Sequence, residues 1–170
     1  MKKFITLLAF FALSLAGAYE LRFSDKNGEN KISFEAVEIG QTNGVKFGGF
    51  NEINGQKAWQ MNDFVSECEY DLAYKAREPE ITDLDNDGVK EVWLIYYKAC
   101  QGGLDPLEMK ILAYEQKGEI TDKYALRGQS LLEIDGGKYG GEFETDFAGA
   151  NPAFLAHAKK LWNKYKKPFD

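Results

Sequence analysis

The stretch VWLIYY, which runs from Val92 to Tyr97, carries apolar or aromatic side chains at every position. A strand that is buried on one side alternates apolar and polar residues, whereas a strand covered on both sides is apolar throughout. The stretch therefore predicts a central strand, within an extended run over residues 90–98, that is covered on both faces.

Short runs of alternating polarity, separated by Gly, Asn and Asp, occur on both sides of that stretch and are typical of β-strands. In the run 68–76, every second residue from Cys68 to Ala76, Tyr70 included, is expected on a half-buried face. Asn54-Gly55 and Asp135-Gly136 suit tight turns in which φ is positive. We expect further strands over residues 19–23, 31–39, 45–50, 57–61, 79–82, 109–115, 120–126, 130–134 and 138–146.

The C-terminal segment NPAFLAHAKKLWNKY has a helical pattern instead. Asn151 can cap a helix, and Pro152 suits the first helical position. One apolar stripe at helical spacing contains Phe154, Leu155, Ala158, Leu161, Trp162 and Tyr165. We expect this helix to pack its stripe on the sheet, with its lysines in solvent; binding to a membrane surface or a partner is the alternative. The fold class is therefore mainly β (α+β), an antiparallel curved sheet or sandwich with a C-terminal amphipathic helix.

The N-terminal residues MKKFITLLAFFALSLAGA have the pattern of a secretory signal peptide. Two lysines precede an apolar run that is too short to span a bilayer, and a small-x-small site follows it. We expect residues 1–18 to be removed before Tyr19, which leaves one β-rich domain over residues 19–170. Retention as an uncleaved anchor is the alternative. The expected location is the periplasm or the outside of a bacterial cell.

The charge of the chain argues against nucleic acid as a partner. The formal net charge is −6, and removal of residues 1–18 with their two lysines makes it −8. A protein that binds phosphate backbones needs a basic stripe, and the only basic cluster is the C-terminal segment 159–167.

The chain contains two cysteines, Cys68 and Cys100, on either side of the acidic segment. An oxidising compartment favours a disulfide between them. The alternative, two free thiols with a redox role, needs a close cysteine pair or a partnering histidine, and the sequence has neither. We expect a structural disulfide.

The segment DLDNDGVKE, residues 83–91, places four carboxylates within nine residues. It is either an acidic hairpin turn or a site for a hard cation such as calcium, which takes oxygen ligands. Acids at alternate positions and a glycine that permits a sharp turn fit calcium better than the octahedral, partly hydrated magnesium. An EF-hand would need an acid at its twelfth position, where this chain has Leu94. The expected calcium ligands are Asp83, Asp85, Asp87, Glu91 and the backbone carbonyl of Val89.

These nine residues resemble the short calcium loops in the β-hairpins of integrin-type propeller blades, whose pattern is Asp-x-Asp-x-Asp-Gly-x-x-Asp/Glu. The longer run DLDNDGVKEVWLIYYKACQGGLDPLEMKILAYEQKGEITDKYALRG resembles a family of small exported bacterial proteins of unknown mechanism, loosely labelled surface-polysaccharide-associated. The match centres on residues 83–97, 100–106 and 123–128. The resemblance implies a cell-envelope setting and no reaction. The simplest expected role of calcium is structural.

The sequence favours a protein that is not an enzyme. His157 is the sole histidine and falls at the edge of the helical stripe, so a histidine-activated serine or cysteine nucleophile is not expected. A glycosidase that uses a pair of carboxylates remains an alternative, because the distance that must separate the two carboxylates cannot be read from the sequence.

Two classes of partner remain as alternatives to a purely structural calcium protein. Asp135-Gly136-Gly137-Lys138-Tyr139 resembles the Ser-Gly-x-x-Tyr motif of periplasmic lysozyme inhibitors, with Asp in place of Ser, and also suits an ordinary hairpin turn. The resemblance implies lysozyme as a partner, with contacts through Asp135, Gly136 and Tyr139. The other class binds an envelope protein or glycan, and exposure of Trp59 and Tyr139 would favour it. Tyr124 and Arg127 are further partner candidates, although Arg127 can instead pair with an acid.

Overall fold

Strand β7 (Glu91–Cys100) lies in the middle of the molecule, and its residues from Glu91 to Ala99 are all buried. Its even-numbered residues Val92, Leu94 and Tyr96 belong to one hydrophobic core, and Trp93, Ile95 and Tyr97 belong to another. The predicted central strand with two covered faces is therefore confirmed. The structure is a computed structural model that describes residues 18–39, 43–100 and 105–168.

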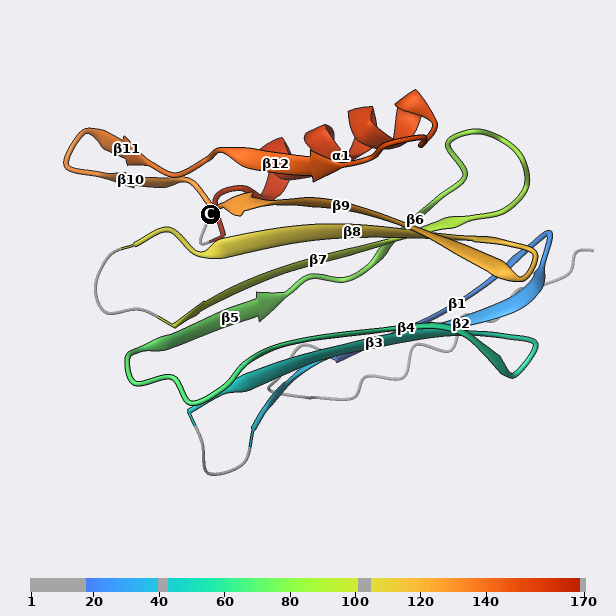
Figure 1. Ribbon diagram of the computed structural model, residues 1–170, viewed down its shortest axis with the longest axis horizontal. Helices are drawn as coiled ribbons and strands as arrows, with labels where there is room; N and C mark the ends of the chain where they lie inside the picture. The colour runs from blue at the N-terminus through green and yellow to red at the C-terminus, as the bar shows by residue number, and fades with distance from the viewer. Residues whose placement is uncertain (1–17, 40–42, 101–104, 169–170) are drawn as a thin grey trace, which may run out of the picture.

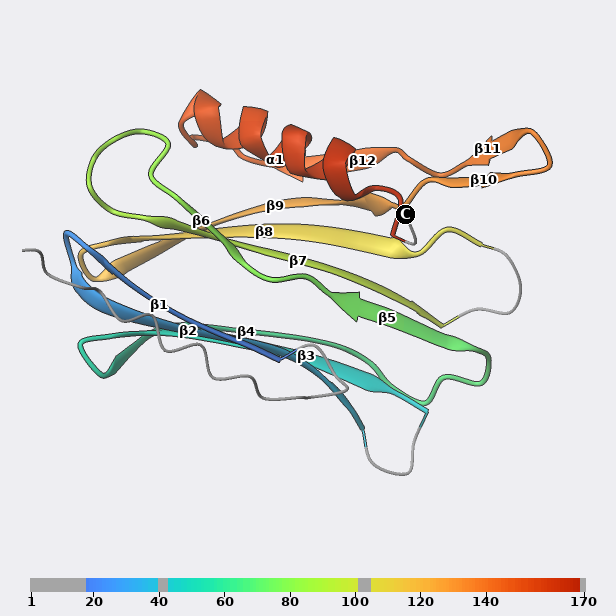
Figure 2. The ribbon, with the colours of Figure 1, turned by 180° about the vertical axis from the view of Figure 1, so that it is seen from behind.

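Two antiparallel sheets and one helix surround this strand. Sheet A is a four-stranded meander of β1 (Ala18–Asp25), β2 (Gly28–Glu38), β3 (Val45–Ile53) and β4 (Gln56–Val65). Sheet B has the order β12 (Phe143–Asp146), β9 (Ile120–Gln129), β8 (Glu108–Lys117), β7 and β5 (Leu72–Ala76), and β6 (Glu80–Thr82) also pairs with β7. Strands β10 (Leu132–Ile134) and β11 (Gly137–Tyr139) form a separate hairpin. Sheet A, sheet B and helix α1 (Pro152–Tyr165) follow one another as layers (Figures 1 and 2).

The predicted C-terminal helix is confirmed. Asn151 caps α1, because its side-chain oxygen accepts a hydrogen bond of 3.0 Å from the backbone N–H of Ala153. Phe154, Ala158, Leu161 and Trp162 are buried against sheet B in the second core. The helix thus covers the face of sheet B that sheet A leaves free (Figure 2). Among the described residues, no helix is long and apolar enough to cross a membrane.

Two strand predictions are wrong in part. The run 68–76 becomes a strand only at Leu72, and Tyr70 is 62% exposed instead of lying on a buried face. Before Leu72, Asn43 holds the chain in a loop by donating hydrogen bonds to the carbonyls of Cys68 and Tyr70. The expected strand 138–146 is divided into β11 and β12, because Gly140 and Gly141 between them both have positive φ (71° and 93°).

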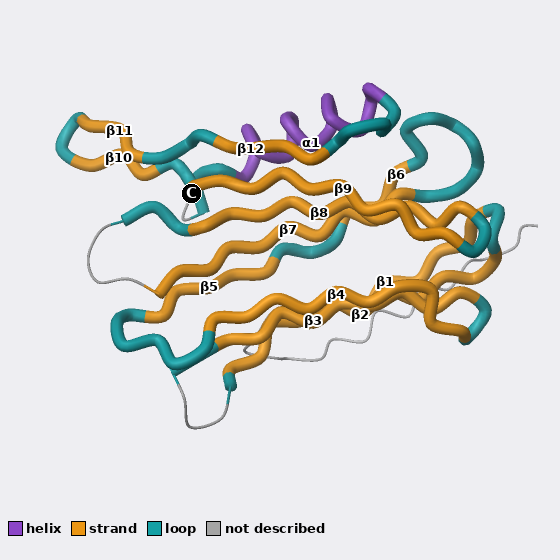
Figure 3. Tube along the Cα trace, in the orientation of Figure 1, coloured by secondary structure: helices purple, strands orange, loops and turns teal. Residues whose placement is uncertain are grey.

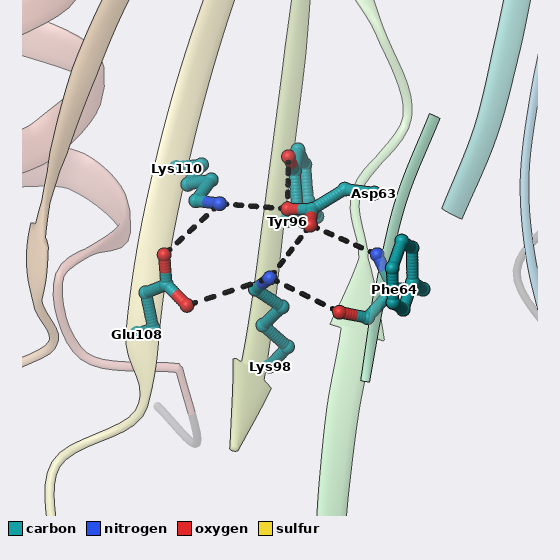
Figure 4. A network of polar contacts seen from close by, with 6 residues as sticks. All are labelled: Asp63, Phe64, Tyr96, Lys98, Glu108 and Lys110. Atoms are coloured by element: carbon teal, nitrogen blue, oxygen red, sulfur yellow. Dashed lines mark hydrogen bonds and ion pairs between the residues drawn. The ribbon is translucent and has the colours of Figure 1, made fainter. Parts of the chain in front are cut away.

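A polar network joins the two sheets on the side of β4 (Figure 4). Asp63 of β4 accepts hydrogen bonds of 2.7 Å from Lys98 of β7 and from Lys110 of β8. Glu108 lies 3.0 Å from Lys110 and 3.6 Å from Lys98, so two lysines and two acids compensate one another. Burial raises the pKa of Asp63, but the hydrogen bonds from its partners outweigh burial and lower that pKa to about 2. The network therefore holds sheet A in place over sheet B.

The disulfide between Cys68 and Cys100 is present, with the two Cα atoms 5.4 Å apart. It joins the loop between β4 and β5 to the end of β7. The prediction of a structural disulfide is confirmed. Disulfides of this kind persist in oxidising, non-cytoplasmic compartments. The signal-peptide prediction lies, except for Ala18, outside the described residues.

Candidate metal centre

The acidic loop connects β6 to β7 and lies at the end of the molecule where the β1–β2 and β8–β9 turns also lie (Figure 3). The loop is not an EF-hand, because strands flank it instead of helices. Leu94, at the position where an EF-hand needs an acid, is a core residue. Asn86 and Gly88 both have positive φ, 59° and 86°. These two residues bend the chain sharply. The bends let acids at alternate positions approach one another.

Hydrogen bonds within the loop orient its acids. Asp85 accepts a bond of 3.3 Å from the backbone N–H of Asp87, and Asp87 accepts one of 2.8 Å from Val89. The β1–β2 turn supports the loop from sheet A, since the N–H of Lys26 donates to the Gly88 carbonyl at 2.8 Å. Asp25 accepts a bond of 3.2 Å from the N–H of Lys90. The loop is therefore held by both sheets.

Glu91 is fully buried at the start of β7. Its carboxylate accepts a hydrogen bond of 2.5 Å from the Thr82 hydroxyl and bonds of 3.1 and 3.2 Å from the Leu84 N–H. Thr82 in turn accepts a bond of 2.7 Å from the Trp93 indole. Burial raises the pKa of Glu91, the bonds from Thr82 and Leu84 oppose this increase, and the charges of Asp85 and Glu115 add to it. A buried acid in this state gains most from a nearby cation.

The predicted ligands lie around this loop with different exposures. Val89 and Glu91 are buried, Asp83 and Asp85 are partly buried, and Asp87 is exposed. Donor oxygens of Asp83, Asp85 and Glu91 lie within 4.8 Å of one another, and so do those of Asp85, Asp87 and Glu115. The predicted acids therefore do converge, and their oxygens could hold a metal ion.

Glu115 is the acid of this cluster that sequence reasoning missed. It belongs to β8, outside the loop, and its side chain is 0% exposed. Burial raises the pKa of its carboxyl, the Lys117 ammonium lowers it, and the charges of Asp85 and Asp87 raise it further. The sequence does contain a signal for the burial of Glu115. Met109, Ile111 and Ala113 alternate along the strand and face the core, and Glu115 is the next residue at the same spacing. A carboxylate at such a position needs a partner.

The other candidate residues belong to neither group of acids, and they do not form one site with one another. Asp135 and Gly136 form the turn of the β10–β11 hairpin, with φ of 51° and 78°, and Tyr139 at its end is 56% exposed. This hairpin projects at the end of the molecule opposite the acidic loop (Figures 1 and 2). Tyr124 is buried between Phe147 and Phe154 on the helix side of sheet B. Arg127 is exposed and makes no ion pair with any residue that the structure describes.

His157, considered for catalysis, and Trp59, considered for stacking on a glycan, are both packed against other side chains. His157 of α1 lies against the Trp93 ring, with centroids 4.8 Å apart, and its Nε2 is 3.8 Å from Glu80. Burial lowers its pKa. The prediction of an interfacial helix residue is confirmed. Trp59 is only 7% exposed because it stacks on Tyr114, with centroids 4.1 Å apart.

Comparison of the chain with protein-family models, with curated proteins and with solved structures finds no match.

Proposed function

We propose that this protein is an exported, non-enzymatic calcium-binding protein of the bacterial cell envelope, periplasmic or secreted. Its site is the acidic loop 83–91 together with Glu115. The observation that carries the proposal is the convergence of carboxylates, all but that of Asp87 buried or partly buried, at a loop with calcium spacing. The Cys68–Cys100 disulfide supports a location outside the cytoplasm.

The proposed ligands are oxygens throughout, as calcium prefers. Asp83, Asp85, Asp87 and Glu91 supply carboxylates, and Val89 supplies its backbone carbonyl. The donor oxygens of each group in the cluster lie within 4.8 Å of one another, and oxygens on opposite sides of one Ca²⁺ are about 5 Å apart. The Asp83 carboxylate also has a buried oxygen, Oδ1, without a hydrogen-bond partner among the described residues. A cation would give that oxygen a ligand bond.

The proposed role of calcium is structural. The loop is in contact with the β1–β2 turn through Lys26 and Asp25, so a cation there would stabilise both sheets at that end. Exported calcium modules bind with dissociation constants of about 0.1 to 1 mM, so occupancy would follow external calcium. A ligand that binds the folded state alone at ten times its dissociation constant stabilises it by about 1.4 kcal/mol.

The experiment is a calcium titration of the purified protein by calorimetry, with thermal unfolding measured in calcium and in chelator. We expect calcium to raise the melting temperature and Asp85→Ala to abolish that increase. The control is Asp135→Asn, which removes an acidic charge at a turn residue remote from the loop. Wild-type protein that binds no calcium, or an unchanged increase in Asp85→Ala, would refute the proposal.

A second candidate function is binding of a neutral saccharide on the outer face of sheet A. Cross-strand pairing places Gly48 between Glu35 and Asn62, so a residue without a side chain forms the centre of a depression of about 390 Å³. On one side of this row of cross-strand partners lies the row Ser33, Phe50 and Gln60. On the other side lies the row Val37, Lys46 and Phe64.

The chemistry around Gly48 suits a hydroxyl-bearing ring. Asn62 and Gln60 can both donate to and accept from hydroxyls, while the apolar side chain of Val37 in the same depression, 46% exposed, can contact the apolar face of a sugar. One acid, Glu35, and one base, Lys46, leave the depression without net charge, which favours a neutral glycan.

This second candidate is tested on an array of neutral and acidic oligosaccharides. Gly48→Val should fill the depression and abolish binding, because Gly48 has extended backbone and only Glu35 within 4 Å of an added Cβ. Arg22→Val, on the same face of edge strand β1, should leave binding unchanged. Equal binding by Gly48→Val and the wild type would exclude this surface.

A further inference from the structure

The acidic cluster consists of two groups of donors that share Asp85. Asp83, Asp85 and Glu91 form one group, and Asp85, Asp87 and Glu115 form the other. Calcium binds oxygens at about 2.3 to 2.6 Å, so the donors around one ion lie within about 5 Å of one another. Asp83 and Glu91 satisfy this limit together with Asp85 but form no such group with Asp87 and Glu115. Two neighbouring centres therefore fit the donors better than one.

Glu115 supplies evidence for the second centre that is independent of the loop. Its side chain is 0% exposed, and its Oε1 has no hydrogen-bond partner or ion pair among the described residues. Oε2 lies 2.7 Å from the Lys117 ammonium. A buried carboxylate oxygen without a partner costs free energy. A carboxylate oxygen of Glu115 lies within 4.8 Å of donors from Asp85 and Asp87, so a cation between these three acids would compensate the buried Glu115 carboxylate.

The strand register adds a second reason for a cation at Glu115. Val92 of β7 pairs with Tyr114 of β8, so Glu91 and Glu115 are one position further along these two antiparallel strands. Like charges opposite each other across two strands destabilise a sheet.

Charge balance agrees with two divalent ions. The cluster has five carboxylates, on Asp83, Asp85, Asp87, Glu91 and Glu115. Lys117 is the only cation that forms an ion pair with any of them among the residues that the structure describes. Lys117 also lies 3.2 Å from Asp122, so at least four negative charges are left in the cluster, and two divalent cations neutralise four. One ion would leave two buried or partly buried negative charges unbalanced.

We propose that this centre holds two Ca²⁺ ions bridged by the carboxylate of Asp85. The first ion is bound by Asp83, Asp85, Glu91 and the Val89 carbonyl, and the second by Asp85, Asp87 and Glu115. The second ion connects the loop to β8, a strand that the loop motif does not include. Because Asp87 is exposed, this ion keeps water ligands and exchanges with solvent. This inference rests on the proposed calcium function.

The test counts the bound ions by native mass spectrometry and calorimetry of the full chain with calcium chloride as the ligand. We expect two ions for the wild type, one for Glu115→Gln, one for Asp83→Asn and none for Asp85→Asn. Asp122→Asn is the matched control, because Asp122 lies 3.2 Å from Lys117 but belongs to neither group, and it should keep two ions.

Each result has a distinct meaning. Wild-type protein with one ion overturns the two-ion centre and leaves the calcium function standing, whereas wild-type protein with no ion refutes both. Two ions in Glu115→Gln would also overturn the inference. If Glu115→Gln does not fold, as judged by circular dichroism, Asp87→Asn replaces it, since Asp87 is exposed and its loss should remove the same ion.

Discussion

Glu91 and Glu115 are buried carboxylates one position beyond the Val92–Tyr114 pair of the central strands β7 and β8. Two acids in this relationship repel each other, and the partly exposed Lys117 ammonium, which lies 2.7 Å from Glu115, pairs with only one of them. The relationship connects the stability of the central sheet with occupancy of the metal centre.

Without calcium, Glu115→Gln should therefore stabilise the protein. Removal of one of two facing charges is expected to increase the free energy of unfolding in chelator by about 0.5 to 1 kcal/mol at pH 7. The same change should reduce the additional stability that calcium provides. Urea denaturation with chelator and with calcium measures both effects. Glu119→Gln, in the β8–β9 turn and exposed, is the control, and a destabilised Glu115→Gln in chelator would contradict the prediction.

Asp63 should make stability depend on pH between about 4 and 2. Its folded pKa of about 2 is lower than the ordinary 3.8, so its contribution is present above pH 4 and is lost as the pH falls through 2. The difference in pKa corresponds to about 2 kcal/mol. Asp63→Asn should thus be less stable than the wild type at pH 7, and the gap should close toward pH 2. Urea denaturation across this range measures the gap, and a gap that is independent of pH would show that the Lys98 and Lys110 ion pairs contribute little.

Loss of the disulfide should destabilise the fold without changing the metal centre. Cys68 and Cys100 are 32 residues apart, and closure of a loop of that length contributes about 3 to 4 kcal/mol. We expect the double variant Cys68→Ala/Cys100→Ala to lose this amount in guanidinium denaturation. It should still bind calcium, since neither cysteine belongs to the cluster. Equal stability of the wild type with and without reductant would contradict the expected contribution.

Gly88 should matter to the metal centre as well as to the fold. Its φ is 86°, which a residue with a Cβ adopts only at a cost of about 1 to 2 kcal/mol. Gly88→Ala should therefore lower both stability and calcium affinity. Gly55→Ala is a matched control, because Gly55 has a φ of 80° in the β3–β4 turn, outside the acidic loop. Gly55→Ala should lose similar stability and keep its calcium affinity, which calorimetry measures. Equal calcium affinities of Gly88→Ala and Gly55→Ala would show that Gly88 does not shape the metal centre.

Trp162 should anchor α1 to sheet B. It is 1% exposed and its indole N–H donates a bond of 3.2 Å to the Gly141 carbonyl. Trp162→Ala should cost about 3 to 5 kcal/mol in the free energy of unfolding. Lys160→Ala, on the exposed face of the same helix, should change it by less than about 0.5 kcal/mol. A fold that tolerates Trp162→Ala without loss would show that the helix layer contributes little to the core.

Strands and helices were predicted well where the apolar residues repeat at the spacing of a strand or of a helix. The apolar run Val92–Tyr97 predicted a covered strand, and the stripe from Phe154 to Trp162 predicted the helix, because burial on a given face repeats at a known spacing. The convergence of the loop acids could be predicted because they are close in sequence. The run 68–76 was predicted poorly, since a loop held by Asn43 replaces the first half of an apparently regular strand.

The sequence by itself determined the class of fold, the central strand, the helix and the identity of the loop acids, since each follows from the spacing of residues along one element. Only the tertiary structure decided that Glu115 joins those acids, that Asp63 pairs with lysines of the other sheet, and that Tyr124 packs against Phe147 and Phe154. Strand pairing and sheet stacking place such residues, and these depend on contacts between segments far apart in the chain, which periodicity within a segment does not encode.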